Sequence, residues 1–366
     1  MNPRRSFHLL VSLLALASTP FVAGCAAETT EPSATSESRL AEGDAMVNVD
    51  ALNLRAGPST NDAVLAVMPN GARVRVKGGS VSGFAPVAYE GQEGWAWAEY
   101  LTPVRPIAIG SLADAVASLA SEAPRRSPGT ELGIAVMNLM TGAYAGAGDD
   151  VRHVSASSAK VVWVAAAMHA GAEVADIAGP IFANSDNLLS GTAIDRAGGI
   201  DAVNDFYWNV AGMEHSIVAS WSFGARRVAR DQGQLGGDNY FTPRDVIAFL
   251  GKLDAGQLLG DRTAELEGYL TLSPRSGYGG WLGTLLPPEA RAGMMHKAGW
   301  LPPPDYAAYS TLNEVGIVQV PGGERYAIAL LARHGSDYAR EARMVERASC
   351  VVYRTVARDA SLPCND

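Results

Sequence analysis

Residues 161–168 are apolar on every side and directly follow the sequence Ser157-Ser158-Ala159-Lys160. A helix with one apolar stripe lies on a protein surface, whereas a helix that is apolar all round must be covered by protein on every side. The chain has 366 residues, 48% of them hydrophobic, so it is long enough to build such a core. The segment therefore predicts a helix buried in the middle of a full-sized domain and starting at Ser157.

Ser157 and Lys160 are suited to act together as a nucleophile and its base. A serine hydroxyl attacks well only when a neighbour removes its proton, and residues three apart share one face of a helix. The chain contains four lysines among 29 lysines and arginines. A buried amine can lose its proton, whereas a guanidinium stays protonated. A lysine at position 160 therefore indicates a role in proton transfer.

Two further clusters follow along the chain, Ser185-Asp186-Asn187 and His296-Lys297-Ala298-Gly299. Taken alone, the first is typical of a helix cap or turn, because Ser, Asp and Asn favour those positions. The second, taken alone, is an edge strand that carries one charge and ends in a glycine, Gly299, which allows close backbone approach. Together with Ser157 and Lys160, Lys297 becomes a cation beside a developing oxyanion.

The rest of this region predicts a two-lobed α/β (α+β) architecture, in which a terminal helix packs on an antiparallel sheet and a helical part is inserted between early and late strands. The predicted elements are a helix over residues 111–123, a strand over 132–139 with a Thr141-Gly142 turn and a return strand, a hairpin of residues 315–320 and 326–332, and a helix over 337–356. Ser336 is the expected cap of the last helix, whose buried face comprises Val345, Cys350, Val352 and Val356.

Residues 46–103 show short alternating segments separated by turns, which predicts a small all-β barrel. The expected strands lie at residues 52–59, 64–67, 73–76 and 94–101, with a Pro69-Asn70-Gly71 turn.

Residues 1–24 read as an export signal, because Arg4 and Arg5 precede an apolar run that is too short and too interrupted to span a bilayer. Residues 25–45 contain almost nothing to bury, so we expect a flexible linker. The signal ends in Val22-Ala23-Gly24-Cys25, which resembles the lipobox of bacterial lipoproteins. The resemblance implies a lipidated Cys25 that anchors an exported protein to a membrane of the cell envelope; the alternative is an ordinary secreted protein.

Cys350 and Cys364 form an even pair in an exported chain, which favours a disulfide, with two free thiols as the alternative. The formal net charge of -9 argues against nucleic acid as a partner. Six scattered histidines without ligand-like spacing argue against a metal site, and we expect no cofactor.

The segments Leu52-Asn53-Leu54-Arg55-Ala56-Gly57-Pro58-Ser59 and Gly94-Trp95-Ala96-Trp97 are similar to the opening and close of the bacterial SH3 domain family. The domain predicted from this resemblance covers residues 46–104. It implies a cell-wall ligand such as peptidoglycan, although a spacer domain without a ligand is an equal alternative.

The order and spacing of the three clusters resemble the class A β-lactamase family and the other penicillin-recognising serine enzymes, over a domain of residues 108–366. The resemblance implies that Ser157 is acylated, that Lys160 acts as base or proton relay and that Ser185 passes a proton to the leaving nitrogen.

The same resemblance assigns substrate-binding roles around this catalytic group. Asn187 would bind the side-chain amide of the substrate, and Lys297 would hold its carboxylate. The amides of Ser157 and Trp300 would form an oxyanion hole, beside Gly299.

The chain departs from this family at two places. Ala298 stands where the family carries a hydroxyl, which should weaken the binding of anionic substrates by about 1.5 to 3 kcal/mol. Residues 221–234, where the family places a water-activating glutamate ahead of a helix that starts like Thr242-Pro243, contain Asp231 as their one carboxylate. We therefore expect acylation with slow deacylation.

Three functions remain open at this point. The first is a β-lactamase-like serine hydrolase that cleaves C–N amide bonds in β-lactams. The second is a penicillin-binding D,D-peptidase-type enzyme that acts on peptidoglycan stem peptides, and the third is a catalytically silent binding protein of the envelope.

Overall fold

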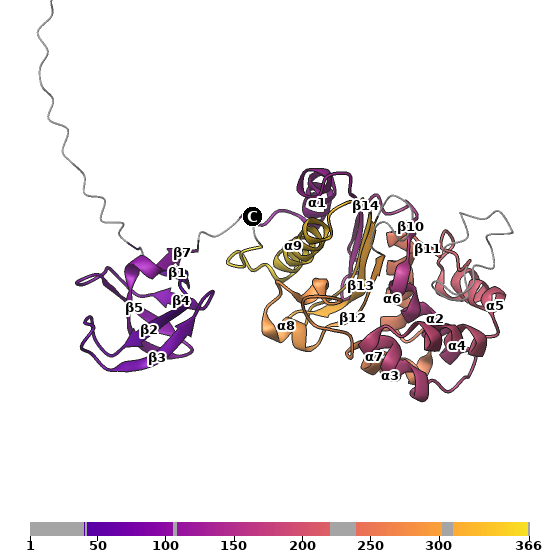
Figure 1. The fold of residues 1–366 in the computed structure, drawn as a ribbon, viewed down its shortest axis with the longest axis horizontal. Helices are drawn as coiled ribbons and strands as arrows, with labels where there is room; N and C mark the ends of the chain where they lie inside the picture. Colours follow the sequence, from indigo (N-terminus) through magenta and orange to yellow (C-terminus); the bar gives the residue numbers. More distant parts are fainter. Residues whose placement is uncertain (1–39, 41, 105–107, 220–238, 302–309, 365–366) are drawn as a thin grey trace, which may run out of the picture.

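The structure of the chain is a computed structural model that describes residue 40 and residues 42–104, 108–219, 239–301 and 310–364. The predicted signal peptide, Cys25 and the predicted linker up to residue 39 lie outside the described residues, as do residues 221–234. Strands β1 to β7 form one body and the remaining elements form a larger one (Figure 1). Among the described residues, none of the helices combines the length and apolar character that crossing a bilayer requires.

The smaller body is an antiparallel sheet around its own apolar core, which includes Leu54, Met68 and Val87. Its strands run in the order β3-β2-β6-β5-β4-β1-β7. They are β1 (Gly43–Val47), β2 (Ala51–Arg55), β3 (Val64–Pro69), β4 (Arg73–Val76), β5 (Phe84–Tyr89), β6 (Gln92–Trp97) and β7 (Leu101–Pro103), with a 3-10 turn η1 (Ala98–Tyr100) before β7. The predicted all-β composition is confirmed.

The expected closed barrel is not formed, because no pairing between the described residues joins β3 to β7. Strand β1 begins at Gly43, within the segment predicted as linker, and pairs with β4 and β7. Ala45 is buried there although it directly follows Asp44. The predicted boundaries between linker and domains stay predictions.

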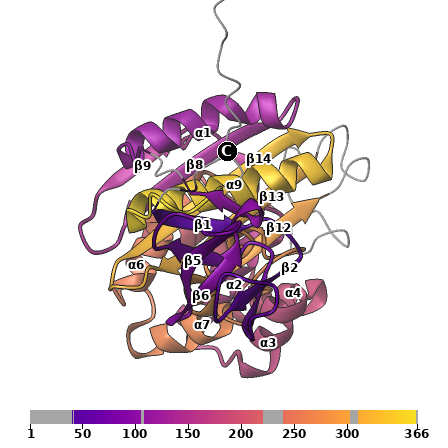
Figure 2. The same ribbon diagram turned by 90° about the vertical axis from the view of Figure 1, so that its left-hand side faces the viewer.

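The larger body has a five-stranded antiparallel sheet in the order β12-β13-β14-β8-β9. These strands are β8 (Glu131–Asn138), β9 (Tyr144–Ala147), β12 (Met295–Leu301), β13 (Ser310–Gln319) and β14 (Arg325–Gly335). Helices α1 (Leu112–Arg126) and α9 (Tyr338–Ala357) cover one face, and α6 (Pro243–Asp254) packs against the other (Figures 1 and 2). Each face therefore has its own hydrophobic core, and the predicted two-lobed architecture is confirmed.

The helical part is inserted between β9 and β12. Its elements are β10 (His153–Val154), η2 (Ala156–Ala159), α2 (Lys160–His169), α3 (Ala175–Asn184), α4 (Asn187–Arg196), α5 (Ile200–Asp205), the π-helical η3 (Phe206–Ala211), β11 (Tyr240–Phe241), α6, η6 (Gly260–Arg262), α7 (Thr263–Leu270), η7 (Trp281–Gly283) and α8 (Pro288–Ala292). In α2 every residue from 160 to 168 is buried, as the apolar pattern predicts.

The predicted elements of this body are found with shifts of a few residues at their ends. Ser111 caps α1 by accepting a hydrogen bond from the amide of Asp114, and Thr242 caps α6 in the same way. The expected cap at Ser336 is wrong: Asp337 caps α9, because its carboxylate accepts from the amide of Arg340. The disulfide between Cys350 and Cys364 is confirmed, with the two Cα atoms 5.5 Å apart.

Candidate active site

Ser157 lies in a 3-10 turn, η2, that runs directly into α2. Helix α2 itself begins at Lys160, three residues later than expected. The residue before the serine, Ala156, has φ +47°, a left-handed conformation that non-glycine residues rarely adopt and that costs conformational energy. This strained turn leaves Ser157 partly exposed while Ser158 and Lys160 are buried.

Lys160 connects the first cluster to the second. Its side chain is fully buried; Nζ donates to the Ser185 carbonyl oxygen at 2.5 Å and to Asn187 Oδ1 at 2.7 Å, and lies 3.0 Å from Ser185 Oγ. Because three oxygens surround this nitrogen, the amine is held in a fixed position at the base of the site.

The second cluster is both a helix cap and part of the site. Helix α3 ends at Ser185, whose φ of +56° turns the chain, and Asp186 then caps α4 by accepting from the Leu189 amide at 2.9 Å. The cap fixes Asp186, and the residues on either side of it, Ser185 and Asn187, contact Lys160. The expected helix cap is confirmed, whereas the catalytic and substrate-binding roles of Ser185 and Asn187 stay predictions.

Lys297 completes the convergence of the three clusters. It lies in β12 with 4% of its surface exposed, and its Nζ donates to Ser185 Oγ at 3.2 Å and to the Ala298 carbonyl oxygen at 2.9 Å. Ser185 Oγ therefore lies between the side-chain nitrogens of Lys160 and Lys297. This arrangement suits a hydroxyl that relays a proton.

The two lysines differ in charge near neutral pH. Burial, together with the positive charge of Lys297, lowers the pKa of Lys160 to about 6, against a smaller opposing effect of Asp186. Burial lowers the pKa of Lys297 to about 8, opposed by the carboxylate of Glu314. Near pH 7, Lys160 is therefore mainly a neutral amine able to accept a proton, while Lys297 remains mainly a cation.

Gly299 brings strand β12 against the nucleophile turn. A Cβ atom at this position would lie 2.6 Å from the Ser158 nitrogen, 2.8 Å from the Ser155 carbonyl oxygen and 2.9 Å from the Ser157 nitrogen. No larger residue fits there without moving the turn. The expected close backbone approach at Gly299 is confirmed, whereas the oxyanion hole of the Ser157 and Trp300 amides stays a prediction.

A buried contact between His296 and Glu314, on the opposite face of β12, was not predicted. His296 Nδ1 contacts Glu314 Oε2 at 2.8 Å, and its Nε2 contacts the Pro274 carbonyl oxygen at 2.8 Å. Both partners are acceptors, so both contacts are hydrogen bonds when both ring nitrogens carry a proton. The other Glu314 oxygen accepts from the Leu282 amide at 3.1 Å, which completes the pair.

Asn313 is a second residue that the sequence reasoning assigned no role. It lies opposite Gly299 in the pairing of β12 with β13, and its Nδ2 donates to the carbonyl oxygens of Val154 and Ser155, at 2.8 and 3.1 Å. It thereby ties β13 to the chain just before the nucleophile. The signal was present: Asn313 and Glu314 lie between the apolar residues Leu312 and Val315 of a buried strand, and buried polar groups need partners.

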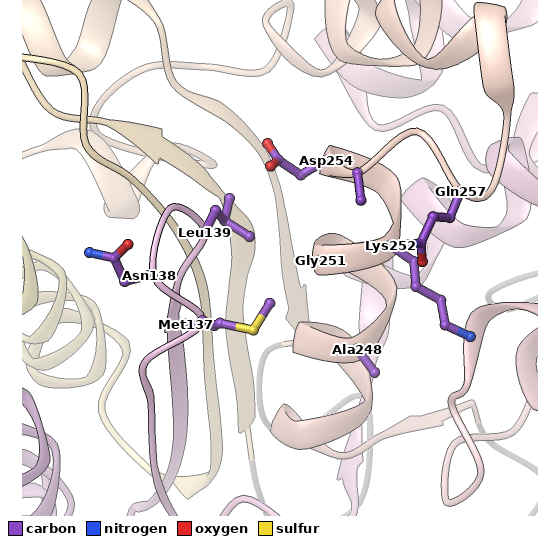
Figure 3. Close-up of a pocket in the computed structure, with 10 residues that line it drawn as sticks. Met137, Asn138, Leu139, Ala248, Gly251, Lys252, Asp254 and Gln257 are labelled. Atoms are coloured by element: carbon purple, nitrogen blue, oxygen red, sulfur yellow. The ribbon is translucent and has the colours of Figure 1, made fainter.

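A pocket of about 280 Å³ lies away from this site, between the end of β8 and α6 (Figure 3). Its lining includes Met137, Leu139, Lys252 and Gln257 and, within the part of the chain that the structure describes, no residue of the three clusters. Lys252 Nζ donates to the Val210 carbonyl oxygen at 2.7 Å, so this lysine ties α6 to η3. In the described ranges, no group of three potential ligand residues could hold a metal ion.

Family models match both bodies of the chain. The model described as a bacterial SH3 domain matches residues 50–102, and the model described as the beta-lactamase enzyme family matches residues 169–356. The second match includes Ser185, Asn187 and Lys297 and begins after Ser157 and Lys160. No curated protein matches the chain in sequence.

Solved structures share the fold of the larger body. PBP-A is 19% identical with a TM-score of 0.56, over 70% of this chain and 99% of that chain. A class A β-lactamase from Bacteroides cellulosilyticus DSM 14838 is 17% identical with a TM-score of 0.57, over 68% and 100%. A mutant of PBP-A, 19% identical with a TM-score of 0.55 over 68% and 98%, is an acyl-enzyme complex with penicillin G.

These likenesses establish the fold, and the model match, which spans about half of the chain, establishes the family. The chain belongs to the beta-lactamase enzyme family and carries a bacterial SH3 domain ahead of its β-lactamase-like serine hydrolase fold.

Proposed function

We propose that the protein is a serine acyl-hydrolase that forms an acyl-enzyme on Ser157 with β-lactams or related amides. The observation that carries the proposal is that Lys160 and Lys297 both contact the Ser185 hydroxyl, next to the turn that holds Ser157. The lowered pKa of Lys160 supports it, since a buried neutral amine is a competent base near pH 7.

In the acylation step, Lys160 Nζ takes the proton of Ser157 Oγ as this oxygen bonds to the substrate carbonyl carbon. The amides of Ser157 and Trp300 stabilise the negative charge that develops on the carbonyl oxygen. The C–N bond then breaks, and Ser185 gives its hydroxyl proton to the leaving nitrogen. Lys160, at 3.0 Å from Ser185 Oγ, returns its proton to Ser185 and becomes neutral again.

Asn187 and Lys297 supply binding and electrostatic effects in this proposal. Asn187 uses Oδ1 to accept from Lys160, which leaves its Nδ2 to donate to a substrate carbonyl. The Lys297 cation favours a negative charge on its neighbours and holds Ser185 in place for the relay.

Deacylation should be slow. Residues 221–234 contain no glutamate, and the carboxylate among them belongs to Asp231. Without a positioned base, water attacks the ester slowly, so we expect the acyl-enzyme to last for minutes or longer. Turnover at the rates of an efficient β-lactamase would contradict this expectation.

The second candidate function is a D,D-peptidase-type reaction on peptidoglycan stem peptides. The bacterial SH3 domain ahead of the catalytic body favours it, since a wall-binding module would hold the enzyme near such a substrate. A catalytically silent binding protein of the envelope is the third, and the strained turn and the two buried lysines argue against it.

We also propose that the protein is exported and anchored to a membrane through a lipidated Cys25. The support is the sequence Val22-Ala23-Gly24-Cys25 after an apolar leader. A Cys25→Ala variant should move from the membrane fraction to the soluble fraction of expressing cells, and unchanged fractionation would contradict the anchor.

Intact-mass spectrometry tests the central proposal. The mature chain with Cys25→Ala is incubated with penicillin G and sampled over time, beside the same chain with Ser157→Ala. A lasting adduct in the first chain and none in the second supports the acyl-enzyme on Ser157. Rapid penicillin loss without an adduct would indicate a working lactamase, and no adduct with no penicillin loss would favour a silent protein.

A further inference from the structure

Four aromatic side chains gather on one side of strand β12. The rings of Tyr278 and Trp300 are 5.5 Å apart and perpendicular, Trp300 and Tyr338 are 5.0 Å apart, and Tyr278 and Trp281 are 5.6 Å apart. Trp281 also donates from Nε1 to the Tyr338 hydroxyl at 3.3 Å. We call these four residues the aromatic cluster.

The aromatic cluster lies beside the proposed reaction centre. Trp300 follows Gly299, the residue whose backbone is pressed against the Ser157 nitrogen. Strand β12 is the terminal strand of the sheet built by the described residues, so one of its edges is not paired with another strand of that sheet. A substrate along this edge has the Ser157 turn toward one face of the strand and the aromatic cluster toward the other.

Next to the aromatic cluster, this face of β12 presents a methyl group and an indole ring. Ala298 and Trp300 are two residues apart in a strand, so their side chains point to the same face, and both belong to the core that α1 and α9 cover. The side chain of Ala298 is a methyl group, which cannot form a hydrogen bond to a substrate. Tyr278 has 66% of its surface exposed, whereas Trp281, beneath it, has 2%. An exposed ring supported by buried rings is a surface prepared for another ring.

We propose that the aromatic cluster is a subsite for an uncharged aromatic ring on the leaving-group side of the substrate. Tyr278 and Trp300 pack against this ring, and the methyl group of Ala298 offers no hydrogen bond to a carboxylate there. The protein is therefore selective for neutral aryl esters and amides over carboxylated ones. This inference rests on the proposed acylation of Ser157 and names the substrate class of that site.

Two esters of phenylacetylglycine test the inference, one with a phenyl leaving group and one with a 3-carboxyphenyl leaving group. Both give the same acyl group on Ser157, so their difference reports the leaving-group side alone. The rate of acylation is measured by intact mass on the mature chain with Cys25→Ala. We expect the phenyl ester to react about tenfold faster or more.

Three variants test whether the preference for the phenyl ester comes from the aromatic cluster. Tyr278→Ala should slow acylation by the phenyl ester about tenfold, through loss of ring packing, and should change the rate for the carboxylated ester little. Tyr100→Ala removes a ring that is 43% exposed in the smaller body and should change neither rate. Ala298→Ser should raise the rate for the carboxylated ester about ten- to hundredfold.

An alkyl fluorophosphonate, which reacts with activated serines and carries no ring, separates the two proposals. If it labels Ser157 but the carboxylated ester reacts faster, or Tyr278→Ala alters neither ester, the subsite is overturned and the acylation stands. If neither ester nor the fluorophosphonate labels Ser157, both proposals are overturned.

Discussion

The two faces of strand β12 differ in chemistry, although they are built by alternating residues of one short segment. On one face, Lys297 reaches the Ser185 hydroxyl and Gly299 admits the nucleophile turn. On the other, His296 pairs with Glu314, and Ala298 and Trp300 border the aromatic cluster. The first face carries polar groups that can move protons, while the second carries a buried histidine–glutamate contact and aromatic rings.

The difference shows how one edge strand can serve two purposes. Because successive side chains point to opposite faces, reactive groups and binding groups can be neighbours in sequence without contacting one another.

The buried lysines Lys160 and Lys297 also differ from the other two lysines of the chain. Lys77 pairs with Glu93 on the surface and Lys252 ties down a backbone carbonyl, so neither is placed to act as a base.

Ser157→Ala should have the largest effect and abolish the reactivity of the first face. It removes the oxygen that forms the acyl bond, so covalent labelling by penicillin G or a fluorophosphonate should be abolished. Ser157 is partly exposed, so the free energy of unfolding should change by about 0.5 kcal/mol or less. Undiminished labelling, measured by intact mass, would show that another residue is the nucleophile.

Glu314→Leu should strongly destabilise the fold from the opposite face. It leaves the buried His296 Nδ1 and the Leu282 amide without their acceptor, which should lower the free energy of unfolding by about 1 to 3 kcal/mol for each group. The double variant His296→Leu with Glu314→Leu should be less destabilised than the sum of the two single variants. Urea unfolding measures all three, and additive effects would contradict a direct stabilising contact between the two side chains.

Gly299→Ala should impair the reactive face of β12 by displacing the turn that holds Ser157. Its Cβ would overlap the backbone of residues 155–158, so Ser157 should be displaced and its acylation rate should fall about a hundredfold. Gly268→Ala is the matched control, because this exposed helical glycine of α7 has open space around its Cβ position. The control should keep its rate and gain up to about 1 kcal/mol of stability. Equal rates in the two variants would refute the close approach as a requirement.

The pH dependence of acylation should report both lysines. The reaction needs Lys160 neutral, so the rate should rise about tenfold per pH unit below about pH 6, where this lysine is protonated. It needs Lys297 charged, so the rate should fall above about pH 8. A Lys297→Met variant, although slower, should lose the fall above pH 8. A rate that is flat between pH 5 and 7 would contradict Lys160 as the base.

The stability of the protein should depend on pH through Lys160, with a smaller effect. Its pKa is about 6 in the folded protein, below its ordinary value of 10.5, so between these values the unfolded chain binds more protons. The free energy of unfolding should therefore rise with pH in this window, by up to about 1.4 kcal/mol per unit for this one group. Lys160→Met should reduce the slope, and an unchanged slope would contradict a buried neutral Lys160.

Much of the fold was predictable because its signals are local. The apolar segment after Lys160 predicted a buried helix, and Ser111 and Thr242 were expected at helix starts where they cap. Errors arose where two residues compete for one role or where distant strands pair. Ser336 and Asp337 are both good caps and only the backbone geometry selects Asp337. The open sheet of the smaller body depends on pairing between strands that are far apart in sequence.

The candidate site divides in the same way. The sequence named Ser157, Lys160, Ser185 and Lys297 by residue type and order, and the structure brings their clusters together. It gave no role to His296 or Asn313, because their partners come from segments that only the tertiary fold places beside them. The aromatic cluster was invisible for the same reason: Tyr278 lies in the turn before η7, Trp300 in β12 and Tyr338 in α9.

The sequence by itself determined which residue types could do the chemistry and which segments had to be buried, since side-chain chemistry and apolar periodicity are local properties. The tertiary structure alone decided that Lys160 is neutral and Lys297 charged near pH 7, because desolvation and the distance between two cations exist only in the folded chain. It also decided which groups face each other across β12, because strand pairing and helix packing join residues more than a hundred positions apart.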